Sequence, residues 1–182
     1  MKSVFLTLII VLVIIASGRA FWSENKADIV QSMVTIKEEG LIDNQLKEQI
    51  GQMLMIGFRG TEAKDESEMA KIIKEVKIGG VVLFDYDVPS KSYPRNIVNK
   101  EQVKQLTNDL QKYSSIPLFV AIDVEGGNIN RLKTKYGFPA ISSPEKMAKD
   151  ETTETESLKI AKELRELGIN MNLAPVVDLN LN

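Results

Sequence analysis

The sequence predicts an α/β domain built on a parallel β-sheet. Short apolar runs, each about as long as a strand, recur from residue 53 onward. Stretches with apolar residues at helical spacing separate these runs. The runs are apolar throughout instead of alternating with polar residues, which indicates strands buried on both faces, as in a parallel sheet.

The predicted elements alternate along the chain. Strands are expected at residues 53–58, 81–84, 118–122 and 169–173, and helices at 43–50, 66–76, 100–113 and 154–167, with a short helical turn opening at 143–144. Asp43 and Asn44 can cap the first helix, because their side chains accept from exposed N–H groups. Pro144 suits a first helical position, and Gly168 suits the end of the last helix.

This alternation fits two architectures, a doubly wound sheet and a (β/α)₈ barrel. A barrel takes about 250 residues, whereas this chain has 182 residues and four predicted strands. The pattern by itself therefore leaves open whether the chain is a small complete α/β domain or the first half of a barrel.

The first twenty residues differ from the rest of the chain. Lys2 precedes an apolar run over residues 4–15, and small residues follow at Gly18 and Ala20. This pattern is typical of a secretory signal peptide, and the run is shorter than the roughly 20 apolar residues of a membrane span. We therefore expect a signal peptide over 1–20 cleaved after Ala20, a secreted or periplasmic protein, and no stable membrane anchor. Residues 21–42 are expected to form a spacer or an N-terminal helix, and residues 43–182 the domain.

Composition excludes several kinds of chemistry. The chain contains no cysteine and no histidine, so disulfides, thiolate metal sites and histidine general bases are excluded. Without residues 1–20 it has 21 basic and 25 acidic residues, a formal net charge of −4. That charge does not favour nucleic acid as a partner. We expect no cofactor and no metal.

Acidic residues follow three of the four predicted strands, at the edge where ligands bind in both architectures. Asp123 ends an apolar strand, where a carboxylate must be solvated, paired or used. Glu125 could share a face with it if the strand continued, and Gly126-Gly127 permits a sharp turn. Arg131 could pair with one of these acids or donate to a ligand. A carbohydrate site and a purely structural ion pair both fit this spacing.

Five segments, taken in order, resemble family 3 glycoside hydrolases. They are Ile50–Phe58, Ile78–Phe84, Asn96–Leu106, Pro117–Leu132 and Glu163–Asp178. The resemblance implies a partial (β/α)₈ barrel of about four βα units over residues 43–182. It also implies hydrolysis of terminal β-linked sugars with retention, and the closest likeness is to the branch that acts on N-acetylglucosaminides of peptidoglycan or chitin fragments.

The resemblance also implies site residues. Asp123 matches an acid that accepts hydrogen bonds from hydroxyls of the sugar, and Arg131 matches an arginine that holds the same sugar. Asp178 matches an acid near the site floor, where Glu125 is a further candidate. The family's nucleophile is an aspartate on a later strand, and the acid/base of this branch involves a histidine. No residue of this chain matches either, so no catalytic residue is predicted.

Three interpretations follow from this departure. The chain is an incomplete copy of a secreted hydrolase, a non-catalytic sugar-binding remnant, or one half of a split enzyme. In the third case its partner is a complementary C-terminal half.

Overall fold

The computed structural model describes residues 31, 40 and 43–177. The chain divides into two compact units, Met1–Leu46 and Lys47–Asn182. Described residues 31, 40 and 43–46 of the first unit are helical, as are residues 47–52 of the second. The predicted signal peptide and nearly all of the predicted spacer lie outside the described residues. No helix in the described part of the chain has the length and apolar character needed to cross a bilayer.

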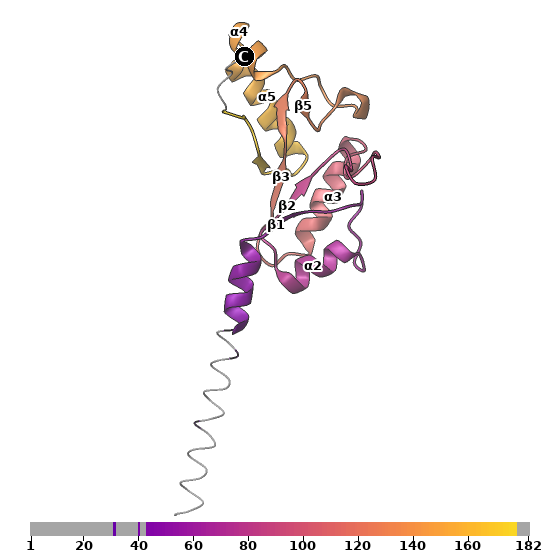
Figure 1. The fold of residues 1–182 in the computed structure, drawn as a ribbon, viewed down its shortest axis with the longest axis vertical. Helices are drawn as coiled ribbons and strands as arrows, with labels where there is room; N and C mark the ends of the chain where they lie inside the picture. The colour runs from indigo at the N-terminus through magenta and orange to yellow at the C-terminus, as the bar shows by residue number, and fades with distance from the viewer. Residues whose placement is uncertain (1–30, 32–39, 41–42, 178–182) are drawn as a thin grey trace, which may run out of the picture. The chain divides into compact units, whose positions relative to one another are not determined.

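The second unit contains the sheets and helices of the domain (Figure 1). Its strands are β1 (Met55–Gly57), β2 (Gly80–Leu83), β3 (Phe119–Ile122), β4 (Val124–Gly126), β5 (Ile129–Asn130) and β6 (Met171–Asn172). Its helices are α2 (Glu68–Val76), α3 (Lys100–Lys112), α4 (Pro144–Lys149) and α5 (Thr153–Glu166), with a 3₁₀ turn at Thr134–Tyr136. The four predicted strands and the predicted helices are therefore present. Three of these strands are shorter than predicted, and β2 has the predicted length but begins one residue earlier.

The main sheet is parallel, with the strand order β1-β2-β3-β6. In the register of the first three strands, Gly57 of β1 pairs with Val82 of β2, which in turn pairs with Ala121 of β3. Spatial order thus follows chain order, with a helical segment in each of the three connections. A doubly wound sheet reverses its order at a switch point, whereas a (β/α)₈ barrel adds each strand beside the last. Of the two architectures that the sequence left open, the strand order therefore favours the barrel over the doubly wound sheet.

Helix boundaries follow from local side-chain caps. Ser67, Asn99 and Ser143 each accept a hydrogen bond from a backbone N–H in the first turn of the helix that follows. Such caps satisfy donors that have no partner within the helix. Gly168 ends α5 with a φ of 71°, in the left-handed region that favours glycine. The predicted roles of Pro144 and Gly168 are both confirmed.

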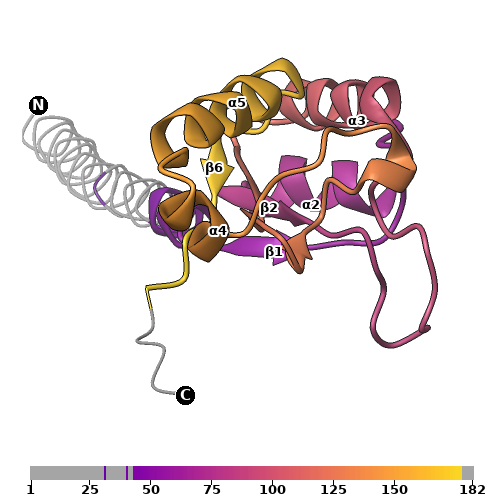
Figure 2. The ribbon, with the colours of Figure 1, turned by 90° about the horizontal axis from the view of Figure 1, so that it is seen from above.

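The hydrophobic core lies between one face of the sheet and the helices. Val81 and Leu83 of β2, with Val120 and Ile122 of β3, are fully buried in it. Figure 2 shows α3 and α5 side by side over this face. The core is therefore a sheet–helix interface, as βα units produce.

The opposite face of the sheet is only partly covered by described residues. Phe119 is 52% exposed, and Val82 is half-buried. A Cβ added to Gly80 would meet both Met55 Cε and Phe119 Cβ, so these apolar groups share this face. The prediction that the strands are buried on both faces is therefore wrong at Phe119, although Gly80 and Ala121 on the same face are buried. In a closed barrel this face is the packed interior.

The segment after β3 contains an antiparallel hairpin, β4–β5, for which no strands were predicted. Gly126, which pairs with Ile129, and Gly127, which follows it in the turn, have φ of 92° and 57°. A Cβ on Gly126 would lie 1.9 Å from the Ser142 carbonyl oxygen. The expectation of a sharp turn at these glycines is confirmed.

Candidate functional site

The hairpin brings Asp123 and Arg131 together at the C-terminal end of β3. Arg131 N donates to the Asp123 carbonyl oxygen at 3.2 Å. Its Nη2 and Nε donate to Asp123 Oδ2 at 3.0 and 3.3 Å. Both side chains are partly exposed, at 28% for Arg131 and 23% for Asp123. Among the described residues no hydrogen bond reaches Asp123 Oδ1, so this oxygen can accept one from a ligand.

A second carboxylate lies behind this pair. Asp85 follows β2 and is fully buried. Arg131 Nη1 lies 3.8 Å from its Oδ1, and Lys133 Nζ lies 2.6 Å from its Oδ2. Neither oxygen receives a hydrogen bond of good geometry, so these contacts are ion pairs. Arg131 is thus held between two acids, one buried and one facing solvent.

Lys133 compensates the buried charge of Asp85. Its contact with the Asp85 carboxylate raises the pKa of Lys133 above its ordinary value of 10.5. The lysine therefore remains protonated at neutral pH. A buried carboxylate without such a partner is strongly destabilising. Asp85 is one of the acids that follow the predicted strands, whereas Lys133 was not predicted as a site residue. The only feature of the sequence that pointed to Lys133 is its position two residues after Arg131.

The loop of residues 85–99 is anchored beside this cluster. Asp87 is 3% exposed and accepts from Arg59 Nε at 3.0 and 3.1 Å. The Ser90 hydroxyl and then the Arg59 guanidinium hold the pKa of Asp87 below its ordinary value. Buried Asn96 accepts from Phe84 N at 2.9 Å and donates to the carbonyl oxygens of Phe58 and Gly60. These contacts tie the loop to the end of β1.

The aromatic ring of Phe84 lies under the cationic groups of the cluster. The guanidinium carbon of Arg95 is 4.7 Å from the ring centroid, and that of Arg131 is 6.0 Å away. A Cβ on Gly57 would meet Phe84 Cε2 and Arg95 Nη2, each at 3.1 Å. Phe84 and Arg95 thus cover the second face of the sheet at its C-terminal end.

Glu125 contacts a different set of residues. Its Oε2 accepts from Val176 N at 3.3 Å. It borders a cavity of about 410 Å³ that is lined by β4, α4, α5 and the segment after β6, including Met147, Ile160, Leu164 and Pro175. The structure therefore brings Asp123 and Arg131 together but does not group Glu125 with them. Asp178 lies outside the described residues.

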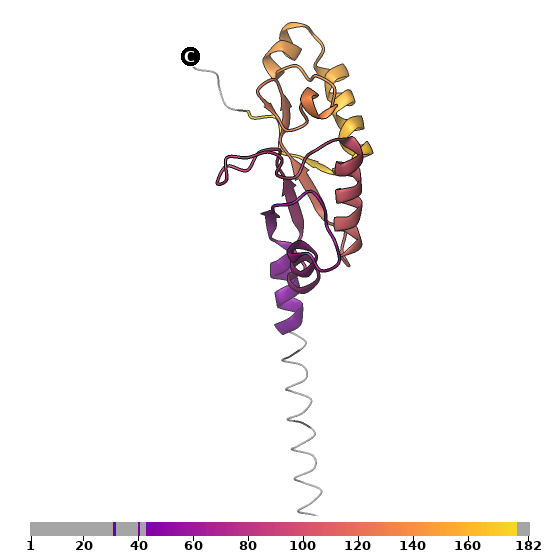
Figure 3. The ribbon, with the colours of Figure 1, turned by 90° about the vertical axis from the view of Figure 1, so that its right-hand side faces the viewer.

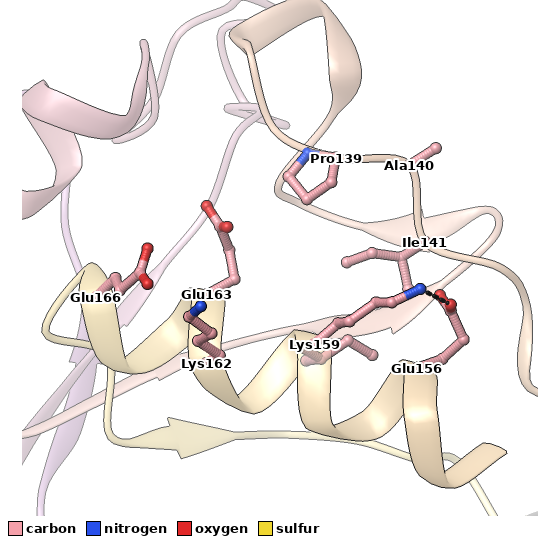
Figure 4. A pocket seen from close by; sticks show the side chains of 9 residues that line it. Pro139, Ala140, Ile141, Glu156, Lys159, Lys162, Glu163 and Glu166 are labelled. Carbon is pink, nitrogen blue, oxygen red and sulfur yellow. Dashed lines mark hydrogen bonds and ion pairs between the residues drawn. The ribbon is translucent and has the colours of Figure 1, made fainter. Parts of the chain in front are cut away.

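A smaller cavity, of about 270 Å³, lies along α5 (Figure 4). Its lining includes two ion-paired acids. Lys159 donates to Glu156 at 2.7 Å, and Lys100 of α3 lies 2.6 Å from Glu163 Oε1. These pairs account for the charges of Glu156 and Glu163 without a ligand, and the second ties α5 to α3.

Comparison with known proteins connects this geometry with one family. Residues 45–182 match the family model described as the glycosyl hydrolase family 3 N terminal domain. Beta-hexosaminidase A of Pseudoalteromonas piscicida is 33% identical over 157 residues, which cover 73% of this chain and 25% of that protein.

Solved structures give the same likeness. A glycoside hydrolase family 3 beta-N-acetylglucosaminidase from Paenibacillus sp. str. FPU-7 superposes with a TM-score of 0.64 at 34% identity, covering 74% of this chain and 24% of that one. Native NagZ from Neisseria gonorrhoeae superposes with a TM-score of 0.54 at 25% identity, covering 70% and 36%. The chain thus matches between about a quarter and just over a third of the length of these relatives.

Proposed function

The chain belongs to glycoside hydrolase family 3, and from this we propose that it provides the sugar-holding part of a β-N-acetylhexosaminidase site. In this proposal Asp123 and Arg131 bind one terminal β-linked sugar of the N-acetylglucosamine type. The relatives named beta-hexosaminidase and beta-N-acetylglucosaminidase support this class of sugar.

The observation that carries the proposal is the partly exposed Asp123–Arg131 pair. Arg131 donors meet Asp123 Oδ2 and leave Oδ1 to accept from a sugar hydroxyl. The guanidinium, partly exposed, has further N–H groups that can donate to sugar oxygens. Buried Asp85 supports the arginine from behind, so the pair is positioned before a ligand arrives.

We also propose that the 182-residue chain does not catalyse hydrolysis by itself. Retention requires a nucleophile and an acid/base about 5 Å apart, acting on two sides of one glycosidic bond. Asp123 is paired with Arg131, while Glu125 contacts Val176 and lines a separate cavity. Their separate partners argue against a catalytic pair of these two acids. The whole protein's activity, release of terminal N-acetylglucosamine with retention, then needs residues that this chain does not have.

Calorimetric titration with N-acetylglucosamine tests the binding proposal. We expect millimolar binding that Asp123→Ala abolishes. Asp109→Ala is a matched control, because Asp109 is also paired with a cation and is 21% exposed, but lies on α3. Absence of binding at millimolar sugar, or equal loss in both variants, contradicts the proposal.

An aryl β-N-acetylglucosaminide tests the absence of catalysis. We expect the purified chain to release no nitrophenol above the buffer rate. Turnover that disappears in Asp123→Asn would show that the chain is itself a hydrolase.

A second candidate, one half of a split enzyme, is favoured by the partly open face of the sheet. Phe119 is 52% exposed on the face that barrel closure would cover. A complementary C-terminal half would bury this residue and supply the catalytic groups. The DNA downstream of the codon for Asn182 discriminates between the interpretations. A separate adjacent reading frame that encodes such a half is expected for a split enzyme, and a continuing frame is expected for an incomplete copy of a secreted hydrolase. A stop with neither leaves the non-catalytic sugar-binding remnant or a decayed gene.

We further propose secretion or periplasmic export through residues 1–20. Amino-terminal sequencing of exported material is expected to begin at Phe21. Material that begins at Met1 would contradict this proposal.

A further inference from the structure

A tyrosine pair lies at the edge of the charged cluster. Tyr93 is 49% exposed, and its ring centroid is 4.7 Å from that of Tyr86, at an interplanar angle of 46°. Lys135 Nζ lies 3.7 Å from the Tyr93 centroid and Lys133 Nζ lies 5.4 Å from it. Neither the fold nor the Asp123–Arg131 pair accounts for a large aromatic ring exposed here.

A series of contacts that begins at Lys133 links Tyr93 with Arg131 and Asp123, the sugar-holding pair. The ammonium group that lies over Tyr93 is also 2.6 Å from Asp85 Oδ2. The other oxygen of Asp85 is 3.8 Å from Arg131, which donates to Asp123. Figures 2 and 3 show the loop that carries Tyr93 projecting on the side of the sheet away from α3 and α5. The ring therefore lies beside the charged cluster that holds Arg131.

The backbone on both sides of Tyr93 is fixed. Ser92 exchanges two backbone hydrogen bonds with Asp87, at 3.0 and 3.3 Å. Arg95 N donates to the Asp85 carbonyl oxygen at 3.0 Å, and its Nε donates to the Phe58 carbonyl oxygen at 2.9 Å. Since the ring also packs against Tyr86, the side chain loses little conformational freedom when a ligand stacks on it.

We propose that Tyr93, backed by Tyr86 and flanked by Lys133 and Lys135, forms a second carbohydrate subsite for the sugar next to the one held by Asp123 and Arg131. The electron-rich face of the ring, which attracts the two ammonium groups, also suits the C–H-rich face of a pyranose. Lys135 is exposed and can move from the ring to donate to a sugar hydroxyl. The ligand class is a β-linked oligosaccharide of at least two sugars. This inference rests on the proposed function and extends it.

Titration of the whole chain with N-acetylglucosamine and with its β-1,4-linked dimer tests the inference. We expect the dimer to bind about 5- to 10-fold more tightly than the monosaccharide, the size of one favourable aromatic contact. Tyr93→Ala should remove this preference and leave monosaccharide binding within about 2-fold. Tyr93→Phe keeps the ring and should keep the preference. Val88→Ala is the matched control, because Val88 is an exposed apolar residue of the same loop.

The possible failures are distinguishable. If neither sugar binds, the proposed function is wrong and the inference is wrong with it. If the monosaccharide binds and the dimer binds no better, or if the preference survives in Tyr93→Ala, only the second subsite is overturned.

Nuclear magnetic resonance of the unaltered chain gives a test that does not depend on the folding of a variant. Ring signals of Tyr93, assigned by their loss in Tyr93→Phe, should shift with the dimer and not with the monosaccharide. Unchanged Tyr93 signals at saturating dimer would overturn the inference.

Discussion

The two faces of the parallel sheet differ sharply in how they are covered. One face buries Val81, Leu83, Val120 and Ile122 completely against the helices. The other exposes Phe119 at one end and is covered at the other end by Phe84 and Arg95, beside the charged site. The βα units thus complete their own outer core, whereas the inner face needs further chain to close it. The site lies on the face that is less complete.

The largest expected effect is on the helix-covered face. Leu83→Ala removes a fully buried side chain from a packed core, so the free energy of unfolding should fall by about 2–5 kcal/mol. Urea unfolding of the two proteins measures the difference. A loss below about 1 kcal/mol would mean that this face is loosely packed and would remove the contrast between the faces.

The buried charge behind the site should show the next largest effect. Lys133→Met leaves Asp85 buried with only the more distant Arg131 as a partner. We therefore expect the free energy of unfolding to fall by about 2–3 kcal/mol. The double variant Asp85→Asn/Lys133→Met should regain part of this stability, because no unpaired charge remains. Additive losses in a double-mutant cycle would show that Lys133 does not stabilise Asp85.

The open face should respond weakly to a polar substitution. Phe119→Ser removes an exposed apolar side chain, so the free energy of unfolding should change by less than about 1 kcal/mol. Binding of an environment-sensitive dye and self-association should both decrease, since exposed apolar surface drives them. Loss of stability as large as that in Leu83→Ala would mean that Phe119 is already covered in solution.

The smallest effect concerns the loop anchor and depends on pH. Since its contacts with Ser90 and Arg59 lower the pKa of Asp87 below 3.8, the folded state is stabilised by its ionised form. That contribution is complete above the unfolded pKa and is lost as pH falls through the lower folded pKa. The midpoint temperature of thermal unfolding should therefore fall less between pH 7 and pH 3 in Asp87→Asn than in the unaltered chain. An identical pH dependence in both would exclude this role.

Much of the fold could be predicted because its signals are local. Pro144 at the start of α4 and Gly168 after α5 lie where the pattern indicated, and helix boundaries agree within about two residues. The hairpin β4–β5 was missed because strands of three and two residues carry no readable periodicity. The pairing of Arg131 with a strand-end acid was foreseen as one alternative, and the structure selects Asp123.

By itself, the sequence determined the alternation of strands and helices, the turn at Gly126-Gly127, and an acid and an arginine close enough along the chain to meet. These features depend on side-chain spacing and backbone preference over a few residues. Only the tertiary structure decided the strand order, the open face, the complete burial of Asp85 between Arg131 and Lys133, and the position of Tyr93 beside them. Those features depend on contacts between distant segments, whose partners are not encoded in any local pattern.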